Sequence, residues 1–224
     1  MKKKHLVIGL GEVGLALAEI FKSDKEDKFK NIQSKEKKCD FLHIAFPFSK
    51  DFIKDTKKYI KKYKPKHTII HSTVPIGVSQ KLGALHSPIR GVHPHLAKGI
   101  KTFKKFIGGK DSHKVAKEFK KFKIDCICVD NSRDTEGLKL WDTTQYGVFI
   151  MLNKEIYGFC KRNDLDFNIV YTLANQTYNE GYLKMHRPEV IRPYLKYVEG
   201  NIGGHCILSN AKMLKSLSAK RLLY

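Results

Sequence analysis

The first residues with chemical potential are three glycines near the amino terminus, in the spacing G-x-G-x-x-G. Gly9, Gly11 and Gly14 follow a short apolar run at residues 5–8 and lead into an apolar helical pattern at residues 15–21. In such a strand–turn–helix unit, the first glycine permits a tight turn, the second lets the backbone approach a pyrophosphate, and the third lets helix and strand pack closely. Free N–H groups at the helix start then face the anion. The motif predicts a dinucleotide-binding loop; a purely structural turn and a loop for another adenosine ligand are the alternatives.

The second candidate is a cysteine near the carboxyl end. Cys206 directly follows Gly203, Gly204 and His205. Glycines before a cysteine let a ligand approach the thiol, and a helix that starts there would lower the pKa of the thiol and raise its thiolate fraction. An isolated cysteine can equally be an inert buried residue. The local sequence leaves both interpretations open.

Alternating strand and helix signals must position these residues. Strands are predicted at residues 5–8, 41–46, 68–71, 106–107 and 125–129, and helices at residues 15–21, 50–63, 78–82 and 112–122. This alternation up to about residue 130 predicts an α/β fold, a Rossmann-like, doubly wound and mostly parallel sheet with helices on both faces.

The second strand of this sheet is expected to be reduced. A dinucleotide-binding fold places an acidic residue at the end of that strand, about 20 residues past the glycine loop. Residues 24–38 are charged and almost free of apolar side chains, so at best residues 29–32 form a vestigial strand. Asp24, Glu26 and Asp27 are therefore expected in a loop, and none is assigned as the ribose ligand.

The pattern changes near Asn131, which predicts two domains. Residues 1–131 form a Rossmann-like dinucleotide-binding domain, and residues 132–224 form a small helical domain that carries the G-G-H-C loop. One long helix is predicted at about 134–163, a shorter one at 167–182, then a proline- and glycine-marked loop and a last helix from about Asn210. The long helix would leave apolar surface bare in a monomer, so a homodimer formed through it is expected.

Composition narrows the class of protein. No run of about 18 apolar residues is present, so no membrane span is expected. The five cysteines show neither zinc spacing nor a disulfide pattern, which predicts no metal site and a cytoplasmic location. The lysines behind the net charge of +21 are spread over predicted helix faces, which favours a solvated surface, with nucleic acid as the alternative partner.

Six motifs, taken in order, resemble the UDP-glucose/GDP-mannose dehydrogenase family. They are GLGEVG, FLHIAFP, HSTVPIG, KKFIGG, EGLKL and GNIGGHCILSNAKML, and together they cover most of the chain. The resemblance implies a compact, divergent relative that lacks the family's C-terminal nucleotide-sugar domain. That family oxidises a sugar-nucleotide alcohol to an acid in two NAD-dependent steps, through a thiohemiacetal and then a thioester on a cysteine.

The resemblance implies roles for four catalytic residues. Cys206 matches the nucleophile, Lys139 a lysine that stabilises oxyanions, and Thr73 a threonine near the nicotinamide; Asn153 lies one residue out of register with a family asparagine. A thiolate nucleophile and a cation beside an oxyanion suit the chemistry of an aldehyde. The expected cofactor-binding residues are Gly9, Leu10, Gly11, Glu12, Val13, Gly14, Pro47, Ser72 and Thr73.

Three departures from the family pattern alter the expected proton handling. The family's glutamate after Ser-Pro is Ile89 here, the asparagine one turn after the lysine is Thr143, and the aspartate four residues past the cysteine is Asn210. Full four-electron oxidation of a sugar nucleotide is therefore not expected. Arginine can grip an anion and histidine can titrate near neutrality. The polar residues that could contact substrate, or serve structural roles instead, are Arg90, His93, His95, Glu180, Arg192 and His205.

The sequence thus predicts an NAD- or NADP-dependent oxidoreductase that acts on a small polar or nucleotide-linked alcohol or aldehyde, with a thiol in the site. A rival hypothesis keeps the fold and changes the chemistry to S-adenosylmethionine-dependent methyl transfer, or to nucleotide binding without catalysis. Residues 24–38 separate the two hypotheses, because a strand there with an acid aimed at the ribose favours a dinucleotide.

Overall fold

The computed structural model describes residues 3–91, 94–200, 202, 205–214 and 216–223. The chain divides into two compact units, Met1–Lys139 and Leu140–Tyr224, called here the sheet unit and the helical unit. The change of sequence pattern lies near Asn131, whereas the sheet unit extends to Lys139. It therefore includes the first two turns of the long helix.

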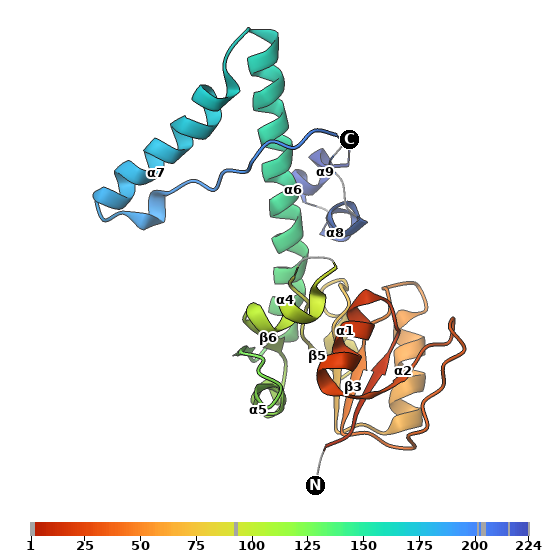
Figure 1. The fold of residues 1–224 in the computed structure, drawn as a ribbon. Helices are drawn as coiled ribbons and strands as arrows, with labels where there is room; N and C mark the ends of the chain where they lie inside the picture. The colour runs from red at the N-terminus through yellow and green to blue at the C-terminus, as the bar shows by residue number, and fades with distance from the viewer. Residues whose placement is uncertain (1–2, 92–93, 201, 203–204, 215, 224) are drawn as a thin grey trace. The chain divides into compact units, whose positions relative to one another are not determined.

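One β-sheet organises the sheet unit (Figure 1). Within the described residues the sheet has seven strands, in the order β2-β1-β3-β4-β5-β6-β7. They are β1 (His5–Ile8), β2 (Asp24–Glu26), β3 (Phe41–Ile44), β4 (His67–Ile70), β5 (Leu85–His86), β6 (Lys105–Gly108) and β7 (Cys126–Val129). Neighbouring strands run parallel except for β5 and β6. The predicted Rossmann-like, mostly parallel α/β fold is confirmed.

Helices cover both faces of the sheet. They are α1 (Glu12–Phe21), α4 (Leu96–Thr102) and α5 (Ser112–Lys120) on one face, and α2 (Phe52–Tyr63) and α3 (Val78–Lys81) on the other. Side chains of β1 alternate between the two cores, because successive residues of a strand point to opposite faces. Val7 joins the core under α1, whereas Leu6 and Ile8 join the core under α2.

The second strand forms, contrary to the expectation of a loop. Asp24–Glu26 pairs in parallel with β1, in a register that places Glu26 beside Ile8. The carboxylate of Glu26 accepts hydrogen bonds from the Lys62 ammonium at 2.9 and 3.0 Å and from the Tyr63 hydroxyl. These partners on α2 satisfy a charged side chain that strand propensity disfavours, so tertiary contacts override the local sequence signal.

The vestigial strand expected at residues 29–32 is absent from the described sheet. Ile32 makes only an isolated antiparallel bridge to Asp27, with backbone N···O distances of 2.8 and 3.1 Å. This bridge closes a short loop directly after β2. The expectation of a loop was therefore wrong for Asp24 and Glu26, and that of a strand at 29–32 was wrong as well. The predicted reduction of the second strand is confirmed, because β2 has only three residues.

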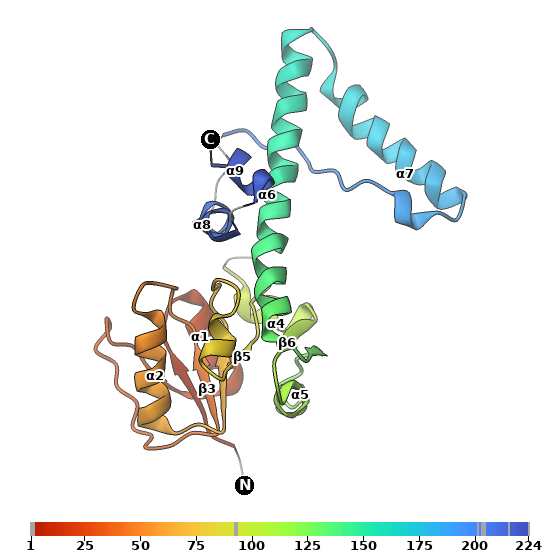
Figure 2. The ribbon, with the colours of Figure 1, turned by 180° about the vertical axis from the view of Figure 1, so that it is seen from behind.

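The helical unit is arranged around α6 (Ser132–Arg162), the predicted long helix. The helix predicted at 167–182 forms as one continuous helical stretch, in which a π-helical turn (Asn168–Leu173) leads directly into α7 (Ala174–Lys184), and a 3-10 turn (Pro188–Val190) follows. The chain ends with α8 (His205–Leu214) and α9 (Leu217–Arg221). In both views, α7 lies on one side of α6 while α8 and α9 lie on the other (Figures 1 and 2).

The last part of the chain corrects one sequence expectation. Helix α8 begins at His205, five residues before the expected start at Asn210. Glycine is a poor helix former, and the sequence that follows the two glycines can be helical from its first residue. Gly147 of α6 allows α8 to approach closely, since a Cβ atom there would lie 2.6 Å from Cγ2 of Ile207. No helix within the described residues is long and apolar enough to cross a membrane.

Candidate functional site

The glycine loop has the geometry that its spacing predicts. Gly9 has a φ of +89°, which L-residues with side chains rarely adopt, and this conformation turns the chain out of β1. A Cβ atom on Gly14 would lie 1.7 Å from the carbonyl oxygen of Gly9, so only glycine permits the contact between α1 and the turn. A Cβ atom on Gly11 would meet no atom within 4 Å. Open space thus lies at the start of α1, where a pyrophosphate would approach the backbone.

An aspartate that the sequence left unassigned completes this loop. Asp27 follows β2, and its Oδ2 accepts a hydrogen bond from the Leu10 N–H at 2.7 Å. Its Oδ1 accepts from the N–H groups of Phe29 at 2.9 Å and Lys30 at 3.1 Å. Burial acts to raise the pKa of Asp27, but the three backbone donors outweigh it and hold that pKa below its ordinary value. The carboxylate is therefore charged at neutral pH.

The same carboxylate has capacity for one more donor. Each carboxylate oxygen can accept about two hydrogen bonds. Among the described residues, Oδ1 of Asp27 receives two and Oδ2 receives one. The Oδ2 atom can therefore accept a hydroxyl group from a ligand without releasing the glycine loop.

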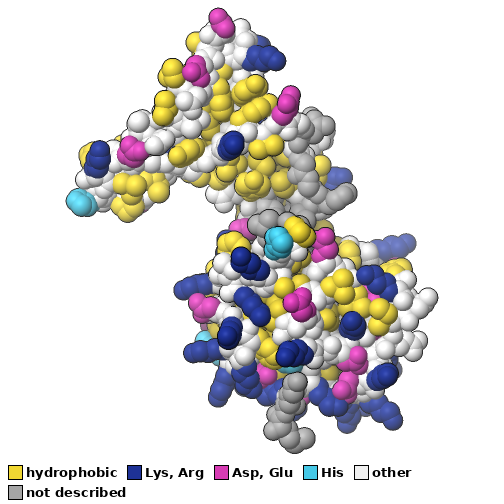
Figure 3. All heavy atoms as spheres, in the orientation of Figure 1, with side chains coloured by type: hydrophobic (Ala, Val, Ile, Leu, Met, Phe, Trp, Pro, Cys, Tyr) yellow, Lys and Arg dark blue, Asp and Glu magenta, His cyan; other side chains and the backbone are white. Residues whose placement is uncertain are grey.

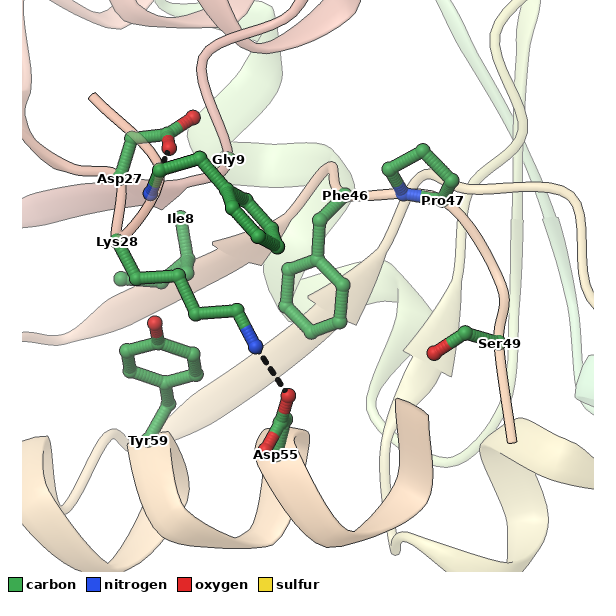
Figure 4. Close-up of a pocket in the computed structure, with 10 residues that line it drawn as sticks. Ile8, Gly9, Asp27, Lys28, Phe46, Pro47, Ser49, Asp55 and Tyr59 are labelled. Atoms are coloured by element: carbon green, nitrogen blue, oxygen red, sulfur yellow. Dashed lines mark hydrogen bonds and ion pairs between the residues drawn. The ribbon is translucent and has the colours of Figure 1, made fainter. Parts of the chain in front are cut away.

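A cavity of about 290 Å³ opens beside Gly9 and Asp27. Its lining includes the aromatic residues Phe29, Phe46 and Tyr59, and Figure 4 shows how Phe46, Pro47 and Tyr59 lie around it. Lys28 crosses the cavity from the loop after β2 to Asp55 on α2, with Nζ 2.8 Å from Oδ2. This hydrogen bond raises the pKa of Lys28. Aromatic side chains beside a carboxylate that has a free acceptor position suit an aromatic ring joined to a sugar.

The loop after β4 is anchored at several points. The Ser72 hydroxyl donates to the carbonyl oxygen of Phe46 at 2.6 Å, and the carbonyl oxygen of Ser72 lies 3.2 Å from Nε2 of His86. Thr73 lies next in this loop and is half-buried. The fully buried carboxylate of Glu136 accepts from the N–H groups of Gly77 at 2.5 Å and Ser79 at 2.8 Å.

Lysines hold the segment that follows β5. Lys139 donates to the carbonyl oxygen of Ile89 at 2.9 Å. Lys105 donates to the carbonyl oxygens of Ser87 at 3.0 Å and Pro88 at 3.1 Å. Burial lowers the pKa of Lys105 to about 7. Three consecutive carbonyl groups are thus fixed by two ammonium groups, and Lys139 contacts the backbone of the residue that replaces the family's glutamate.

Two of the departures from the family pattern lie in contact within the helical unit. Nδ2 of Asn210 donates to Oγ1 of Thr143 at 2.7 Å, which joins α8 to α6. Asn153 is buried, and its Nδ2 donates to the carbonyl oxygen of Leu195 at 2.9 Å, which ties the chain segment before α8 to α6. In the described structure, the Asn153 side chain thus has a structural partner.

Some predicted site residues lie partly or wholly outside the described part of the chain. Cys206 is the second residue of α8, as the hypothesis of a thiol at a helix start requires, but its side chain and that of His205 are not among those described. His93, Gly203 and Gly204 also lie outside the described residues.

The remaining substrate candidates are dispersed. Arg90 stacks over the ring of Phe103, with 5.7 Å between its Cζ atom and the ring centroid, and His95 is exposed just before α4. The other two candidates belong to the helical unit. Glu180 of α7 accepts from the side-chain amide of Gln176 at 3.0 Å, and the Arg192 guanidinium lies 3.5 Å over the ring of Tyr178. Figures 1 and 2 place α7, the helix that carries Glu180, on the side of α6 opposite to α8.

Sequence reasoning missed three polar residues with defined roles in the sheet unit: Asp27, Lys105 and Glu136. Asp27 stands at the distance from the glycine loop at which an acid is expected, but no apolar strand pattern precedes it. Lys105 directly precedes the apolar residues Phe106 and Ile107, and this position at the start of a strand is the only sequence signal for it. Nothing in the sequence near Glu136 marks it as buried.

Comparisons with known proteins establish the fold. No family model and no curated protein matches the chain. Among solved structures, the UDP-D-ManNAc dehydrogenase of Pyrococcus horikoshii aligns with a TM-score of 0.73 at 16% identity, over 97% of this chain and 68% of that one. A 3-hydroxyisobutyrate dehydrogenase of Mycobacterium tuberculosis aligns with a TM-score of 0.73 at 10% identity, over 100% of this chain and 92% of that one. A UDP-glucose dehydrogenase of Pyrobaculum islandicum aligns with a TM-score of 0.70 at 15% identity, over 100% of this chain and 68% of that one.

These three proteins are dehydrogenases of sugar nucleotides or of a hydroxy acid by their names, and this chain is similar to each over nearly its whole length. At such low identity the likeness concerns the fold. The chain therefore has the Rossmann-like fold of the sugar-nucleotide and hydroxyacid dehydrogenases, in agreement with the motifs that resemble the UDP-glucose/GDP-mannose dehydrogenase family.

Proposed function

We propose that the protein is an NAD-dependent oxidoreductase that acts on a small polar or nucleotide-linked alcohol or aldehyde. The observation that carries the proposal is Asp27, a charged carboxylate at the end of β2 that contacts the glycine loop and keeps one acceptor position free. An acid at this position binds the ribose 2′-hydroxyl of NAD, and its charge disfavours the 2′-phosphate of NADP.

The residues of the sheet unit fit the parts of this cofactor. The aromatic cavity beside Tyr59 accepts the adenine, Oδ2 of Asp27 accepts the ribose hydroxyl, and the open space at Gly11 accepts the pyrophosphate at the start of α1. Leu10, Glu12 and Val13 complete the loop, while Pro47, Ser72 and Thr73 lie at the ends of β3 and β4, toward which the nicotinamide half would extend.

The cofactor supplies a hydride acceptor in the oxidation direction. The substrate's C–H bond breaks with its electron pair transferred as hydride, and its O–H bond releases a proton. Lys139 stabilises the developing oxyanion, and Thr73 orients the hydroxyl group. The thiol of Cys206 serves as the acid–base group or as a nucleophile toward the aldehyde. Ile89 cannot carry a proton, and the side-chain amide of Asn210 donates a hydrogen bond to Thr143. Without carboxylates at these two positions, a single two-electron oxidation is favoured over two successive ones.

Binding measurements on the whole chain test the proposal. We expect isothermal titration calorimetry to detect NAD binding, with weaker binding of NADP and none of S-adenosylmethionine. Asp27→Asn removes the charge and one acceptor site, and should weaken NAD binding at least tenfold, about 1.4 kcal/mol. Asp24→Asn, at the first residue of β2 and without a contact to the glycine loop among the described hydrogen bonds, is the matched control and should bind NAD as the wild type does.

Three results would separate the alternatives. Binding of S-adenosylmethionine without NAD would replace the proposal by methyl transfer. NAD binding without turnover on any of a panel of hydroxy acids and nucleotide sugars would support nucleotide binding without catalysis. Equal NAD affinity in Asp27→Asn and wild type would remove Asp27 from the cofactor site.

A further inference from the structure

Three buried histidines form a hydrogen-bonded ladder across the sheet, separate from the candidate site. Nδ1 of His5 lies 3.0 Å from Nε2 of His43, and Nδ1 of His43 lies 2.9 Å from Nε2 of His71. His5 begins β1, His43 lies in β3 and His71 directly follows β4. Because Val7 pairs with His43 and Ile69 pairs with His43, each histidine lies two residues further along its strand than the previous one. The three side chains therefore share one face of the sheet.

A single carbonyl group fixes the tautomer of all three rings. Nδ1 of His71 lies 2.8 Å from the carbonyl oxygen of Ser87, which can only accept, so this Nδ1 must carry the hydrogen. A neutral imidazole has one N–H, so Nε2 of His71 is bare and accepts from Nδ1–H of His43. The same step assigns Nδ1–H to His5 and leaves its Nε2 bare. Burial holds the pKa values of His43 and His71 well below the ordinary value, which keeps these rings neutral.

The ladder therefore ends in an acceptor that has no donor. Nε2 of His5 is buried and has no hydrogen-bond partner among the described residues. Its neighbour is Oε1 of Glu118 on α5 at 3.6 Å, and Oε2 of the same carboxylate accepts from the Lys121 ammonium at 2.7 Å. A bare ring nitrogen and a carboxylate oxygen face each other at a distance too long for a hydrogen bond. One proton between them would satisfy both atoms.

The surroundings of His5 suit a cation. Phe21 and Phe41 stack on the ring at centroid distances of 4.8 Å and interplanar angles of 5° and 12°. Two aromatic faces stabilise a positive ring by cation–π attraction. The aromatic neighbours extend to Phe122, whose ring centroid lies 5.4 Å from that of His5 at an interplanar angle of 80°. His5 is thus surrounded by aromatic rings.

The charged groups around the ladder favour a proton at the His5 end. Glu118 and Asp40 attract a positive charge on His5, and Lys3 opposes it. At the opposite end, the ammonium of Lys105 faces His71 and His43, and His86 also faces His71, so a positive charge is disfavoured there.

We infer that His5 and Glu118 form a buried proton-binding site at the open end of the histidine ladder. The ligand is one proton from solvent, which binds Nε2 of His5 and is hydrogen-bonded to Oε1 of Glu118, while His43 and His71 stay neutral. No covalent bond between heavy atoms changes. Proton uptake creates an ion pair between the start of β1 and α5 in place of the long contact between Nε2 and Oε1. Burial lowers the pKa of His5 and Glu118 acts against it, which places uptake below pH 6.5.

Nitrogen NMR on the full-length, ¹⁵N-labelled wild type tests the inference. At pH 8 we expect the three ladder rings to show a protonated Nδ1 and a bare Nε2. On titration to pH 5, Nε2 of His5 should gain a proton first. A ladder ring with a protonated Nε2 at pH 8, or titration of His43 or His71 before His5, would overturn the inference.

A matched pair of variants tests the role of the carboxylate. In Glu118→Gln, the side-chain amide can donate to Nε2 of His5, so proton uptake should move at least one pH unit lower, a tenfold loss of proton affinity. Glu36→Gln removes the same charge from an acid that binds Lys4 at 2.6 Å, and should leave the titration of His5 unchanged. Equal titration of His5 in Glu118→Gln and wild type contradicts the inference. If Glu118→Gln does not fold, the wild-type tautomers and titration order still decide it.

Discussion

At the scale of single residues, the glycine loop separates a requirement of folding from a requirement of binding. Gly14 is needed for the fold, because a Cβ atom there would overlap the carbonyl group of Gly9. Gly11 has a φ of −69° and open space around its Cβ direction, so the folded chain alone does not require glycine. The open space at Gly11 agrees with the proposed approach of a pyrophosphate to this backbone.

Substitutions at these two glycines should have opposite effects. Gly11→Val should leave the fold intact, at a cost of about 1 kcal/mol for a poorer helix N-cap, but weaken NAD binding more than tenfold because the side chain fills the space of the pyrophosphate. Gly14→Ala should lower the free energy of unfolding by several kcal/mol through backbone overlap. Calorimetry with NAD and urea unfolding measure the two effects. Unchanged NAD affinity in Gly11→Val would contradict the assignment of this loop.

The proposed thiol chemistry makes a separate prediction. Cys206→Ser should abolish turnover on the physiological substrate while the unfolding midpoint in urea stays within error of the wild type, because serine is similar in size but a far weaker nucleophile. Cys160→Ser, at a buried cysteine of α6, is the control and should affect stability more than turnover. Full activity in Cys206→Ser would remove the thiol from the mechanism.

At the scale of elements, the first two turns of α6 join three segments at the carboxyl edge of the sheet. Thr135 contacts Nδ1 of His86 at 3.0 Å, Glu136 accepts from the loop that carries Thr73, and Lys139 donates to Ile89. Glu136 therefore fixes a loop that holds a proposed catalytic hydroxyl. The helix positions this loop and Lys139 together, all within the sheet unit.

Loss of the Glu136 carboxylate should loosen this arrangement. In Glu136→Gln one side-chain oxygen is replaced by an NH₂ group, which cannot accept from a backbone N–H and leaves a buried donor unpaired. The expected loss in the free energy of unfolding is about 1–3 kcal/mol, with a lower kcat where Thr73 takes part in catalysis. Asp134→Asn, an acid exposed on the same helical turn, should change neither quantity. Equal urea midpoints for Glu136→Gln and wild type would refute this role.

The ladder across β1, β3 and β4 predicts how stability depends on pH. The pKa values of His43 and His71 are lowered in the folded state, so below pH 6.5 the unfolded chain binds more protons than the folded chain. Their contribution is complete above pH 6.5 and is lost as pH falls, at about 1.4 kcal/mol per pH unit for each histidine. Urea unfolding at pH 8, 7, 6 and 5 measures the slope.

A substitution in the middle of the ladder checks this slope. His43→Leu should reduce the acid dependence by about one proton, although it destabilises the protein at pH 8 by leaving the neighbouring rings unpaired. His113→Gln, at an exposed position of α5, should keep the wild-type slope. An identical slope in His43→Leu and wild type would show that the ladder is not the source of acid sensitivity.

The elements that could be predicted from the sequence are those with a periodic apolar pattern. β1, α1, α2 and α6 were expected within a few residues of their bounds, because burial of an apolar face determines them. β2 could not be predicted, because Lys62 and Tyr63 on α2 stabilise its charged residues. Asp27 was missed with it. The contacts of Lys139 and Asn210 were also invisible, since any carbonyl or hydroxyl group can be the partner of an ammonium or an amide.

At the scale of the whole molecule, charge and apolar surface are distributed unequally. Residues 1–139 contain 32 Lys and Arg against 15 Asp and Glu, a net charge of +17, which leaves +4 for residues 140–224. Figure 3 shows basic side chains over the sheet unit and apolar side chains along the helical unit. The exposed large apolar residues of the helical unit include Trp141, Tyr146, Leu152, Phe159, Ile169, Leu173 and Leu183. Contiguous apolar surface of this kind marks an interaction site.

Helix α7 is the element of the helical unit whose side chains most clearly lack packing within one copy. None of its residues, all of which the structure describes, is buried. Most helical stability in proteins comes from packing of an apolar face, and the large apolar side chains Leu173 and Leu183 of this helical stretch stay exposed in one copy. We propose that a second copy of the chain supplies this packing, through α6 and α7, in a homodimer.

Sedimentation equilibrium on the full chain tests this dimer. We expect a dimer for the wild type at micromolar concentration, and a monomer for a Leu152→Lys and Phe159→Lys double variant, because two buried charges without partners oppose association. Ile127→Lys introduces a charge at an exposed apolar position of β7 in the sheet unit and should leave the dimer intact. Circular dichroism should show that α7 loses helicity in the monomeric variant. A monomeric wild type with undiminished helix content would show instead that α7 is stable alone, and the apolar surface of α6 would then need a different partner.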